Sequence, residues 1–316
     1  MSASSHDGWV SDSWRRRLVD GTIPSMMKRR KLTAARKALI WWFRAPANPY
    51  ICVSFAVDST AATGYLADLA QGHDAAVSIN HLVTAIVGRV LREFPKANDR
   101  LARGRLVRRR ACGLAMPVDL RVAGTVGAQE TAMAVLEEAD QLSLVQIAAG
   151  SRKVVDAERT GRSALGWVQW ATRLIDRTPY PVLAPLLSGF DWLTRNSPLS
   201  DLLFGHLPGA AVTNVGAALA PQAGVLFRGA SMEIPQRLMH VGTVWGVSVI
   251  QDEVIPVNGE PQVRPMLPVV LCFDHRLCDG VYASKMVQRF SAILLEPERE
   301  FGADGAAVAR LRPHAD

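Results

Sequence analysis

The chain has 316 residues, of which 49% are hydrophobic and 21% are charged. These proportions are ordinary for globular proteins, so disordered, collagen-like and low-complexity classes are excluded and a sizeable core can form. The 36 basic residues exceed the 29 acidic ones by 7, which suits an anionic ligand, a nucleic acid or a membrane surface alike. Four cysteines are too few and too scattered for a disulfide framework, which indicates a reducing compartment.

No export or membrane-spanning signal is evident. Met1–Val10 is polar and lacks the charged-then-apolar order of a signal peptide. The longest uncharged stretch, residues 206–227, contains prolines and glycines that suit a spanning helix poorly. We therefore expect a soluble, cytoplasmic protein whose residues 1–27 form a mobile segment.

The first half of the chain predicts strands alternating with helices. Helical spacing of apolar residues, a cap at Ser143 and a stop at Pro95 mark the helices. β-Branched and aromatic residues with partial alternation mark the strands. In chain order we predict a helix from Thr33 toward Trp42, a strand at 49–57, helices at 60–70 and 79–94, a basic β-like segment at 101–115 and a helix at 144–159.

Residues 160–207 differ in character, because tryptophans and leucines crowd together between prolines. We interpret them as a helical insertion that packs its own small core. A lid over an apolar substrate and a membrane-facing patch are the alternatives, so peripheral membrane contact stays open. The basic clusters at residues 15–17 and 28–31 are open in the same way, between a solvated helix face, an anionic ligand and an anionic membrane.

The second half of the chain predicts a sheet. Segments at 211–216, 242–250 and 254–257 indicate strands, the last two flanking a hairpin-like turn. Leu267–Phe273 is a continuous apolar run of seven, typical of a strand buried on both faces, and a helix follows at 281–295. Strands and helices alternate irregularly without a glycine-rich phosphate fingerprint. The predicted fold class is therefore α/β, a mixed α+β sheet flanked by helices, and not a dinucleotide fold.

A cluster of ionisable residues, Asp274–Gly280, follows the buried strand directly. Charges in that position are costly unless they pair, which makes the cluster a candidate site. His275 can act there as a general base because an imidazole titrates near neutral pH, with Asp279 and Gly280 shaping a tight turn. A salt-bridged turn without chemistry is the alternative. No histidine has a further ligand at a metal-binding spacing, so no metal is predicted.

The same cluster, Asp-His-Arg-Leu-Cys-Asp-Gly, resembles the D-H-R-x-x-D-G motif of the 2-oxoacid dehydrogenase acyltransferases, the catalytic domains of dihydrolipoamide acyltransferases. The resemblance implies the fold of their relative, chloramphenicol acetyltransferase. It covers about residues 28–300, predicted as one catalytic domain, with 301–316 as a C-terminal tail. Further segments are similar to family motifs in the expected order: Leu32–Lys37, Val57–Thr60, Arg92–Asn98, Leu142–Ala148, Thr213–Gly216 and Val263–Met266.

The resemblance implies a role for each site residue. His275 would take a proton from the acceptor, or from the coenzyme A (CoA) thiol in reverse. Thr213 would donate its hydroxyl to the oxyanion of the tetrahedral intermediate, and Asn214 would support the loop beside it. Asp279 would pair with Arg36 and pin the turn to the first helix. The sites would lie between subunits of a homotrimer or a higher threefold assembly, with His275 and Thr213 from neighbouring chains.

Two departures from the family pattern shape the expected function. No lipoyl or subunit-binding domain precedes the matched region, and the 160–207 insertion is longer than the family's loop. We therefore expect a free-standing acyltransferase that uses acyl-CoA, with no lipoyl group on this chain. The alternatives are a dehydrogenase-complex core served by another chain's lipoyl domain and a non-catalytic scaffold.

The excess of basic residues does not select a partner. Nucleic-acid binding is not expected, because no reading motif accompanies the charge. The basic run at Arg103, Arg105, Arg108, Arg109 and Arg110 fits CoA phosphates and a solvated edge strand equally well.

Overall fold

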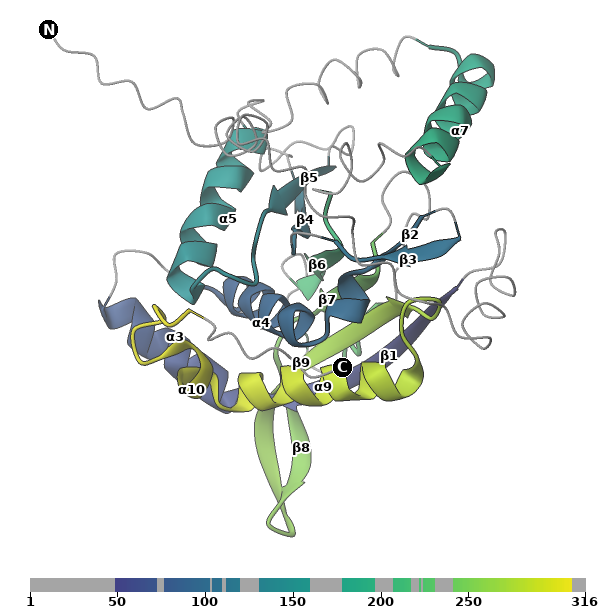
Figure 1. Cartoon of the computed structure of the whole chain (residues 1–316). Helices are drawn as coiled ribbons and strands as arrows, with labels where there is room; N and C mark the ends of the chain where they lie inside the picture. Colours follow the sequence, from purple (N-terminus) through teal and green to yellow (C-terminus); the bar gives the residue numbers. More distant parts are fainter. Residues whose placement is uncertain are drawn as a thin grey trace, which may run out of the picture.

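The computed structural model describes a mixed sheet with helices packed on one face (Figure 1). The mobile segment predicted at 1–27, the helix predicted at 33–42, Arg36 and parts of the 160–207 insertion lie outside the described residues. The described residues are 49–72, 77–102, 104–109, 112–119, 131–159, 178–196, 207–216, 222, 224–230 and 241–308.

Among the described residues, seven strands form the main sheet, in the order β1–β9–β7–β6–β4–β5, and β8 pairs with the outer part of β9. The β4–β6 and β6–β7 pairs are parallel, and the other pairs are antiparallel. The predicted mixed α/β class is therefore confirmed. The strands are β1 (Tyr50–Asp58), β4 (Leu114–Asp119), β5 (Thr131–Leu136), β6 (Ala210–Asn214), β7 (Thr243–Val247), β8 (Gln251–Val257) and β9 (Glu260–Asp274).

The helices on the sheet follow the predicted apolar spacing. In α4, the side chains of Leu82, Ile86 and Val90 are fully buried, and Pro95 ends the helix in the short 3₁₀ helix η1 (Pro95–Asn98). In Figure 1 these helices lie to the left of the strands and below them. They are α3 (Thr60–Gly72), α4 (Ile79–Glu93), α5 (Leu144–Arg159), α9 (Gly280–Leu295) and α10 (Pro297–Phe301).

Strand β9 is buried on both faces over the apolar run that predicted it. Leu271 and Phe273 belong to the main core beneath the helices, where Trp245 of β7 stacks on Phe290 of α9 with ring centroids 5.0 Å apart. Cys272, between them in sequence, belongs to a second apolar cluster. Because alternate residues point to opposite faces, this division fixes the register of the strand.

Two predicted features differ in the structure. The basic segment at 101–115 divides into β2 (Arg100–Ala102), β3 (Arg105–Val107) and the start of β4, because the chain turns at Gly104 with a positive φ. The prediction of a hairpin-like turn between 250 and 254 is wrong. β7 and β8 both pair with the long β9, and the chain turns instead at Asn258–Gly259, where both residues have positive φ.

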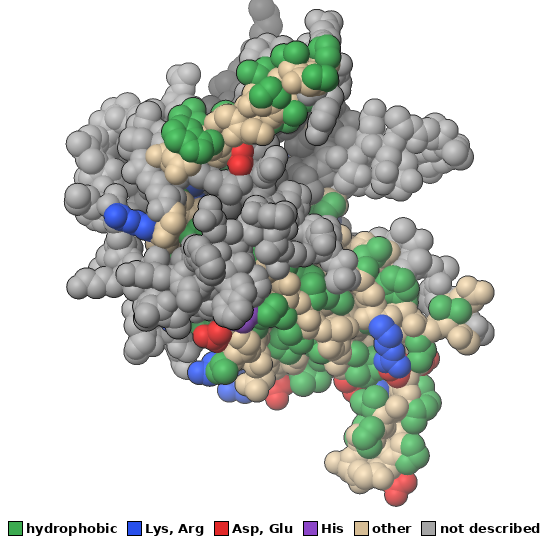
Figure 2. All heavy atoms as spheres, turned by 90° about the vertical axis from the view of Figure 1, so that its right-hand side faces the viewer, with side chains coloured by type: hydrophobic (Ala, Val, Ile, Leu, Met, Phe, Trp, Pro, Cys, Tyr) green, Lys and Arg blue, Asp and Glu red, His purple; other side chains and the backbone are tan. Residues whose placement is uncertain are grey.

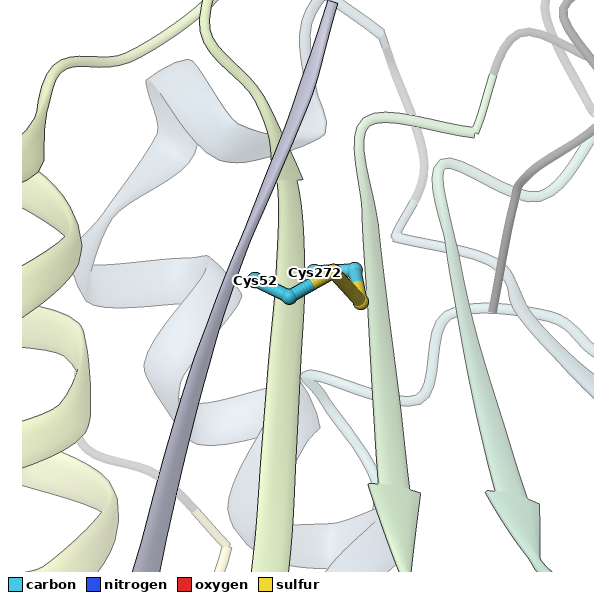
Figure 3. Close-up of a disulfide and its surroundings, with 2 residues drawn as sticks. All are labelled: Cys52 and Cys272. Atoms are coloured by element: carbon cyan, nitrogen blue, oxygen red, sulfur yellow. A yellow bond between two sulfur atoms is a disulfide. The ribbon is translucent and has the colours of Figure 1, made fainter. Parts of the chain in front are cut away.

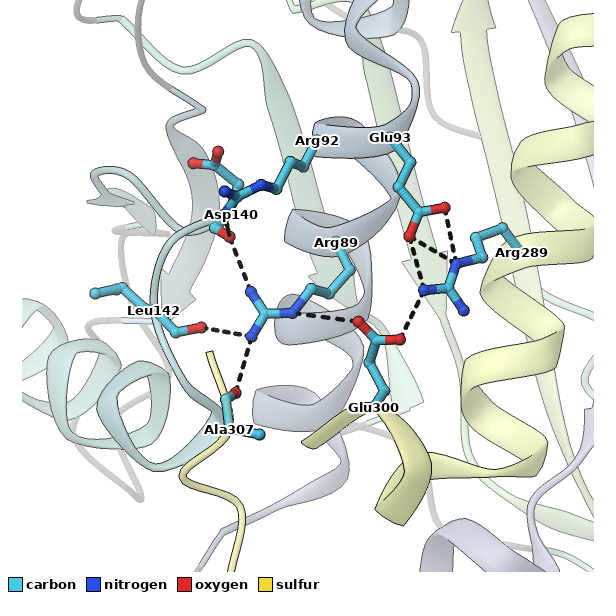
Figure 4. A network of polar contacts seen from close by, with 8 residues as sticks. All are labelled: Arg89, Arg92, Glu93, Asp140, Leu142, Arg289, Glu300 and Ala307. Atoms are coloured by element: carbon cyan, nitrogen blue, oxygen red, sulfur yellow. Dashed lines mark hydrogen bonds and ion pairs between the residues drawn. The ribbon is translucent and has the colours of Figure 1, made fainter. Parts of the chain in front are cut away.

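A buried arginine ties the C-terminal part of the described chain to the core (Figure 4). Arg89 of α4 is 1% exposed and donates to the carbonyl oxygens of Asp140, Leu142 and Ala307 at 2.8, 3.0 and 3.2 Å. Its Nε lies 3.6 Å from the carboxylate of Glu300. Residues 301–308, predicted as the beginning of the tail, are thus held against α4 and α5.

Helix α7 (Tyr180–Asn196) lies in the predicted helical insertion and has an unusual surface. Its carboxylate, Asp191, is 8% exposed, whereas Trp192 is 65% exposed. Figure 2 shows the apolar side chains of this helix along its outer side, at the top of the view. The exposed large apolar residues are Val182, Leu186, Phe190, Trp192 and Leu193. The helix reverses the usual pattern of a surface helix, which turns apolar residues inward.

In the part of the chain that the structure describes, no helix is long and apolar enough to span a membrane.

Cys52 of β1 and Cys272 of β9 form a disulfide (Figure 3). The two residues are directly opposite each other in the antiparallel register. The sequence did not reveal the pair, because 220 residues separate its members. The other two cysteines, Cys112 and Cys278, are buried and are not in a disulfide. The number of cysteines therefore does not by itself indicate a reducing compartment.

Candidate active site

The turn after β9 holds a buried ion pair. Arg276 Nη2 lies 2.7 Å from Asp274 Oδ2, and Arg276 Nε lies 3.0 Å from Asp274 Oδ1. The Arg276 backbone N–H also donates to Asp274 Oδ1 at 2.8 Å. Both residues are buried, at 3% and 5% exposure for Asp274 and Arg276. The charges after the apolar strand are therefore paired, as the sequence required.

His275 lies between these two partners and is half-buried. Its backbone N–H donates to the carbonyl oxygen of Pro49 at 2.9 Å, and the Asp274 N–H donates to that of Gly242 at 2.9 Å. The turn is thus bonded to the segments on both sides of β9. The His275 ring stacks at 6.2 Å from the ring of Phe273. A partly accessible imidazole on a fixed backbone has the placement that a general base needs.

The 3₁₀ helix η1 packs against the His275 turn. The Lys96 N–H donates to the hydroxyl of Tyr282 in α9 at 3.1 Å. A Cβ at Gly242 would collide with the carbonyl oxygen of Ala97 and lie 2.7 Å from Leu277 Cδ1. Only glycine fits this close approach, so the start of β7, η1 and the turn are packed as one unit.

The other residues predicted around His275 have structural positions of their own. Asp279 is the N-cap of α9 and accepts a hydrogen bond from the Tyr282 N–H at 2.9 Å. Gly280 is the first residue of α9, and a side chain there would meet no atom within 4 Å. The buried Cys278 thiol lies 3.9 Å from the carbonyl oxygen of Asp274. Arg36, the predicted partner of Asp279, is outside the described residues.

Thr213 and Asn214 lie together at the end of β6, and both are half-buried. The Asn214 side-chain amide donates to the side-chain oxygen of Asn80, in the first turn of α4. A Cβ at Gly216 would collide with the backbone of Ser248 and Val249, so the chain leaves β6 through a gap that only glycine fits. The sequence did not predict a role for Asn80. No local feature of the helix pattern distinguishes an asparagine that contacts a distant strand from one that faces solvent.

A second unpredicted residue at this end is His81, the neighbour of Asn80. Its Nδ1 accepts a hydrogen bond from the Ser78 N–H at 3.1 Å, which leaves the proton of the neutral ring on Nε2. Burial, and secondarily the positive charge of Arg152 in α5, lowers the pKa of His81 below its ordinary value. His81 is therefore held neutral at the N-terminus of α4.

The register separates Thr213 from His275 within one chain. Thr213 pairs with Gly246, and Gly246 pairs with Val270. His275 follows Val270 by five positions in the sequence, which corresponds to about 16 Å along the strand direction. Strand β7 also lies between β6 and β9. The two predicted catalytic groups are thus at opposite ends of the sheet, too far apart to act on one carbonyl group.

The basic run of β3 and the following loop is largely engaged in the fold. Arg108 Nε lies 2.6 Å from Asp99 Oδ1. Arg109 is 5% exposed, and its Nη1 donates to the carbonyl oxygen of Leu207 at 2.8 Å. Arg103 and Arg110 are outside the described residues. Arg108 and Arg109 therefore support the loop, although the Arg108 side chain is still 38% exposed, and Arg105 is exposed as well. Among the described residues, no group of three or more His, Cys, Asp and Glu side chains is arranged to hold a metal ion.

Comparison with known proteins places the His275 turn in a matched segment. Residues 230–301 match the family model described as 2-oxoacid dehydrogenases acyltransferase (catalytic domain). A curated relative from Bartonella vinsonii subsp. berkhoffii, the dihydrolipoyllysine-residue succinyltransferase component of a 2-oxoglutarate dehydrogenase complex, is 24% identical over 165 residues. The alignment covers 52% of this chain, and the chain spans only 29% of the relative's length.

Solved structures share the fold over most of the chain. A probable dihydrolipoamide acetyltransferase from Listeria monocytogenes 4b F2365 has a TM-score of 0.54 and 18% identity, covering 84% of this chain and 94% of its own. The Azotobacter vinelandii dihydrolipoamide acetyltransferase has a TM-score of 0.54 and 19% identity, covering 88% and 92%. The cubic core of a pyruvate dehydrogenase multienzyme complex has a TM-score of 0.53 and 19% identity, with the same coverage.

These likenesses define the class first: the described chain has the fold of dihydrolipoamide acetyltransferase cores. More particularly, its segment 230–301, which contains β7, β8, β9 and the His275 turn, is similar to the catalytic domain of the 2-oxoacid dehydrogenase acyltransferases. The resemblance predicted from the sequence is confirmed.

Proposed function

We propose that the chain is a CoA-dependent acyltransferase, which moves an acyl group between a CoA thioester and an acceptor by direct attack. The observation that carries the proposal is the His275 turn. A half-buried imidazole lies on a turn whose buried carboxylate and guanidinium, Asp274 and Arg276, are paired, within the segment that matches an acyltransferase catalytic domain. The acyltransferase class also agrees with the succinyltransferase activity in the curated relative's name.

The reaction needs one proton shuttle and one oxyanion donor. His275 accepts the proton of the acceptor nucleophile, which attacks the thioester carbonyl carbon and forms a tetrahedral oxyanion. The hydroxyl of Thr213 donates a hydrogen bond to that oxyanion. When the intermediate collapses, CoA leaves as a thiolate and takes the proton back from His275. No covalent acyl-enzyme forms, so the buried thiol of Cys278 has no chemical role.

The positions of Thr213 and His275 favour an active site shared between subunits. Since the two lie at opposite ends of the sheet in one chain, His275 of one subunit would act with the Thr213 hydroxyl of its neighbour. A closed threefold ring satisfies every such site, because each contact joins one end of the sheet to the other end in the next subunit. The similarity to a cubic core, whose symmetry includes threefold axes, supports a homotrimer or a larger threefold assembly.

A comparison with the Azotobacter vinelandii enzyme supports a role for Asp279 in the fold of the turn. A serine, a histidine and an asparagine were investigated there for their roles in the catalytic mechanism, and the asparagine follows the histidine by four residues. Asp279 follows His275 by the same interval. An ionised carboxylate cannot donate a hydrogen bond as an amide does. We therefore assign Asp279 to capping α9 and to pairing with Arg36, rather than to contacting the reacting atoms.

A dehydrogenase-complex core is the second candidate, favoured by the names of the curated relative and of the cubic core. In that case the acceptor or donor would be a dihydrolipoyl group carried by another chain. The two candidates share the His275 chemistry and differ in the acceptor and in the assembly. Strong preference for dihydrolipoamide, together with a shell in light scattering, would select the second candidate. Turnover with small or lipophilic acceptors by a free trimer would select the first.

The test is a panel of acyl-CoA thioesters and acceptors, with free CoA and acylated acceptor measured by mass spectrometry. We expect turnover by the wild-type protein with at least one combination. His275→Ala should lower the rate by about 10²- to 10⁴-fold while leaving the oligomer intact. Arg299→Ala, at an 84% exposed side chain remote from the turn in sequence, is the matched control and should retain the wild-type rate. Equal turnover by folded His275→Ala would refute the general-base assignment.

A further inference from the structure

The Cys52–Cys272 disulfide lies directly beside the His275 turn. In the β1–β9 ladder, Cys52 is opposite Cys272, and Tyr50 is opposite Asp274 two positions further on. Immediately beyond, Pro49 accepts the hydrogen bond from the His275 N–H. The crosslink therefore closes the end of the ladder from which the turn departs.

The two cysteines differ in exposure. Cys52 is exposed on β1, which is at the end of the strand order and, among the described strands, pairs with β9 alone. Cys272 is 1% exposed and packs in the second apolar cluster with Val244 and Val270. An external thiolate can therefore reach the sulfur of Cys52, whereas that of Cys272 is shielded.

We propose that Cys52 is a site of reversible thiol–disulfide exchange with low-molecular-weight thiols, which opens and closes the crosslink beside His275. A thiolate attacks the Cys52 sulfur, forms a mixed disulfide with it and expels Cys272 as a thiolate, which takes a proton. A second thiolate attacks the external sulfur of the mixed disulfide, leaving Cys52 as a thiolate that is also protonated. In total, two thiols are oxidised to one disulfide and the protein gains two thiols.

Opening the crosslink changes the support of the His275 turn. Without the covalent bond, the Tyr50 end of β1 is held by non-covalent contacts, among them the ladder hydrogen bonds and the hydrogen bond from the Tyr50 hydroxyl to the Val241 carbonyl oxygen. The ends of edge strands open locally more readily than their centres. The hydrogen bond from His275 to Pro49 lies at that end. Reduction therefore loosens the backbone that positions the imidazole. This consequence for the rate rests on the proposed function, whereas the exchange chemistry at Cys52 does not.

The exchange is tested on the full chain with reduced and oxidised glutathione as the probe, at a series of ratios. After acid quenching and denaturation, alkylation is counted by mass spectrometry. The oxidised protein should carry two labels, on Cys112 and Cys278, and the reduced protein should carry four. Native alkylation of the reduced protein should modify Cys52 before Cys272. Cys112→Ala is the matched control, because it removes one label but keeps the gain of two.

Hydrogen exchange gives a readout that does not depend on activity. The His275 amide should exchange faster in the reduced protein, and Cys52→Ser should show this faster rate whether or not glutathione is present. Four labels without any thiol, or a crosslink that resists glutathione until the protein is denatured, would overturn the proposed exchange. An unchanged His275 amide after opening would overturn the coupling to the turn. Redox-sensitive exchange in a protein without acyl transfer would instead contradict only the proposed function.

Discussion

The negative charge of Asp274 is the counter-ion of a buried guanidinium. Arg276 is 5% exposed and is paired with the Asp274 carboxylate through two guanidinium nitrogens. Asp274→Asn keeps the shape and removes the negative charge, so it leaves a buried guanidinium without its counter-ion. We expect a loss of about 3–5 kcal/mol in the free energy of unfolding, measured by urea denaturation.

The exposed pair Arg299–Glu296 is the control for this substitution, since its side chains are 84% and 64% exposed. Glu296→Gln should change the free energy of unfolding by less than about 1 kcal/mol, because water screens the pair. Equal, small changes in both variants would show that the Asp274–Arg276 pair is not a buried support of the turn.

Substitutions of Thr213 can distinguish a chemical role of its hydroxyl from a packing role of the side chain. If Thr213 has its proposed role, Thr213→Ala should lower the catalytic rate constant by about 10²- to 10³-fold, with a smaller change in KM, because the lost hydroxyl would donate to the oxyanion of the transition state. Thr213→Ser keeps the donor and should stay active. Steady-state kinetics of both variants provide the measurement. An inactive serine variant with normal unfolding would mean that Thr213 is not the oxyanion donor.

Single residues were predictable where the signal was local. His275 could be identified because a charged cluster interrupts an apolar run, and the structure shows those charges paired. Asn80 and the Cys52–Cys272 disulfide could not be predicted, because their partners are 134 and 220 residues away. A contact of that kind depends on strand order, which one sequence does not reveal.

At the scale of elements, the N-terminus of α4 is a pH-sensitive point. The folded-state pKa of His81 is lowered by burial, and its Nδ1 must stay unprotonated to accept the Ser78 N–H. Below the ordinary histidine pKa of about 6.5, the unfolded chain binds the proton first, so the stability that depends on neutral His81 is lost as the pH falls. At pH above that value the contribution is fully present.

His81→Gln should therefore weaken the acid sensitivity of folding. We expect the loss of unfolding free energy between about pH 7.5 and 5.5 to be smaller in the variant than in the wild type. Urea denaturation at the two pH values measures the difference. Carboxylates titrate equally in both proteins, so the comparison isolates the imidazole. Parallel pH profiles would contradict the lowered pKa.

Helix α7 should tolerate polar substitution on its outer face. Leu186 and Trp192 are 62% and 65% exposed, so Leu186→Gln and Trp192→Gln should each change the free energy of unfolding by at most about 0.5 kcal/mol. Leu82→Ala, at a fully buried position of α4, should cost about 2–5 kcal/mol. Denaturant unfolding distinguishes the two classes. A large cost at Leu186 or Trp192 would show that the outer face is covered in solution.

Elements with a strong period were predicted closely, and those defined by pairing were not. The helices at α4 and α5 and the buried part of β9 follow their apolar patterns. Strand β5 was not predicted, and β8 was assigned to the wrong partner, because both are specified by the strand beside them. Edge pairing leaves a weak local signal, since one register differs from another only in long-range contacts.

At the scale of the whole molecule, the proposed site between subunits predicts complementation. Inactive His275→Ala and inactive Thr213→Ala subunits, refolded together, should form mixed trimers. Each mixed trimer would contain one interface where an intact His275 meets an intact Thr213, so about a third of its sites should be active. Turnover after mixing, with mixed oligomers confirmed by mass spectrometry, is the measurement.

Mixing two preparations of the same single variant is the control and should restore nothing. A monomer in light scattering would contradict the shared site. So would confirmed mixed trimers without activity. Neither result would contradict the fold, because the strand register that separates Thr213 from His275 within one chain does not depend on assembly.

The proposed sharing of active sites between subunits also has a genetic consequence. A subunit that lacks both groups would spoil two sites, its own and its neighbour's. When half of the randomly assembled subunits are defective, the intact sites would fall to about a quarter, the product of the two chances, rather than to a half. A cell with one functional and one defective gene copy would therefore lose more activity than gene dosage predicts, and a missense allele that still assembles would be more harmful than a deletion.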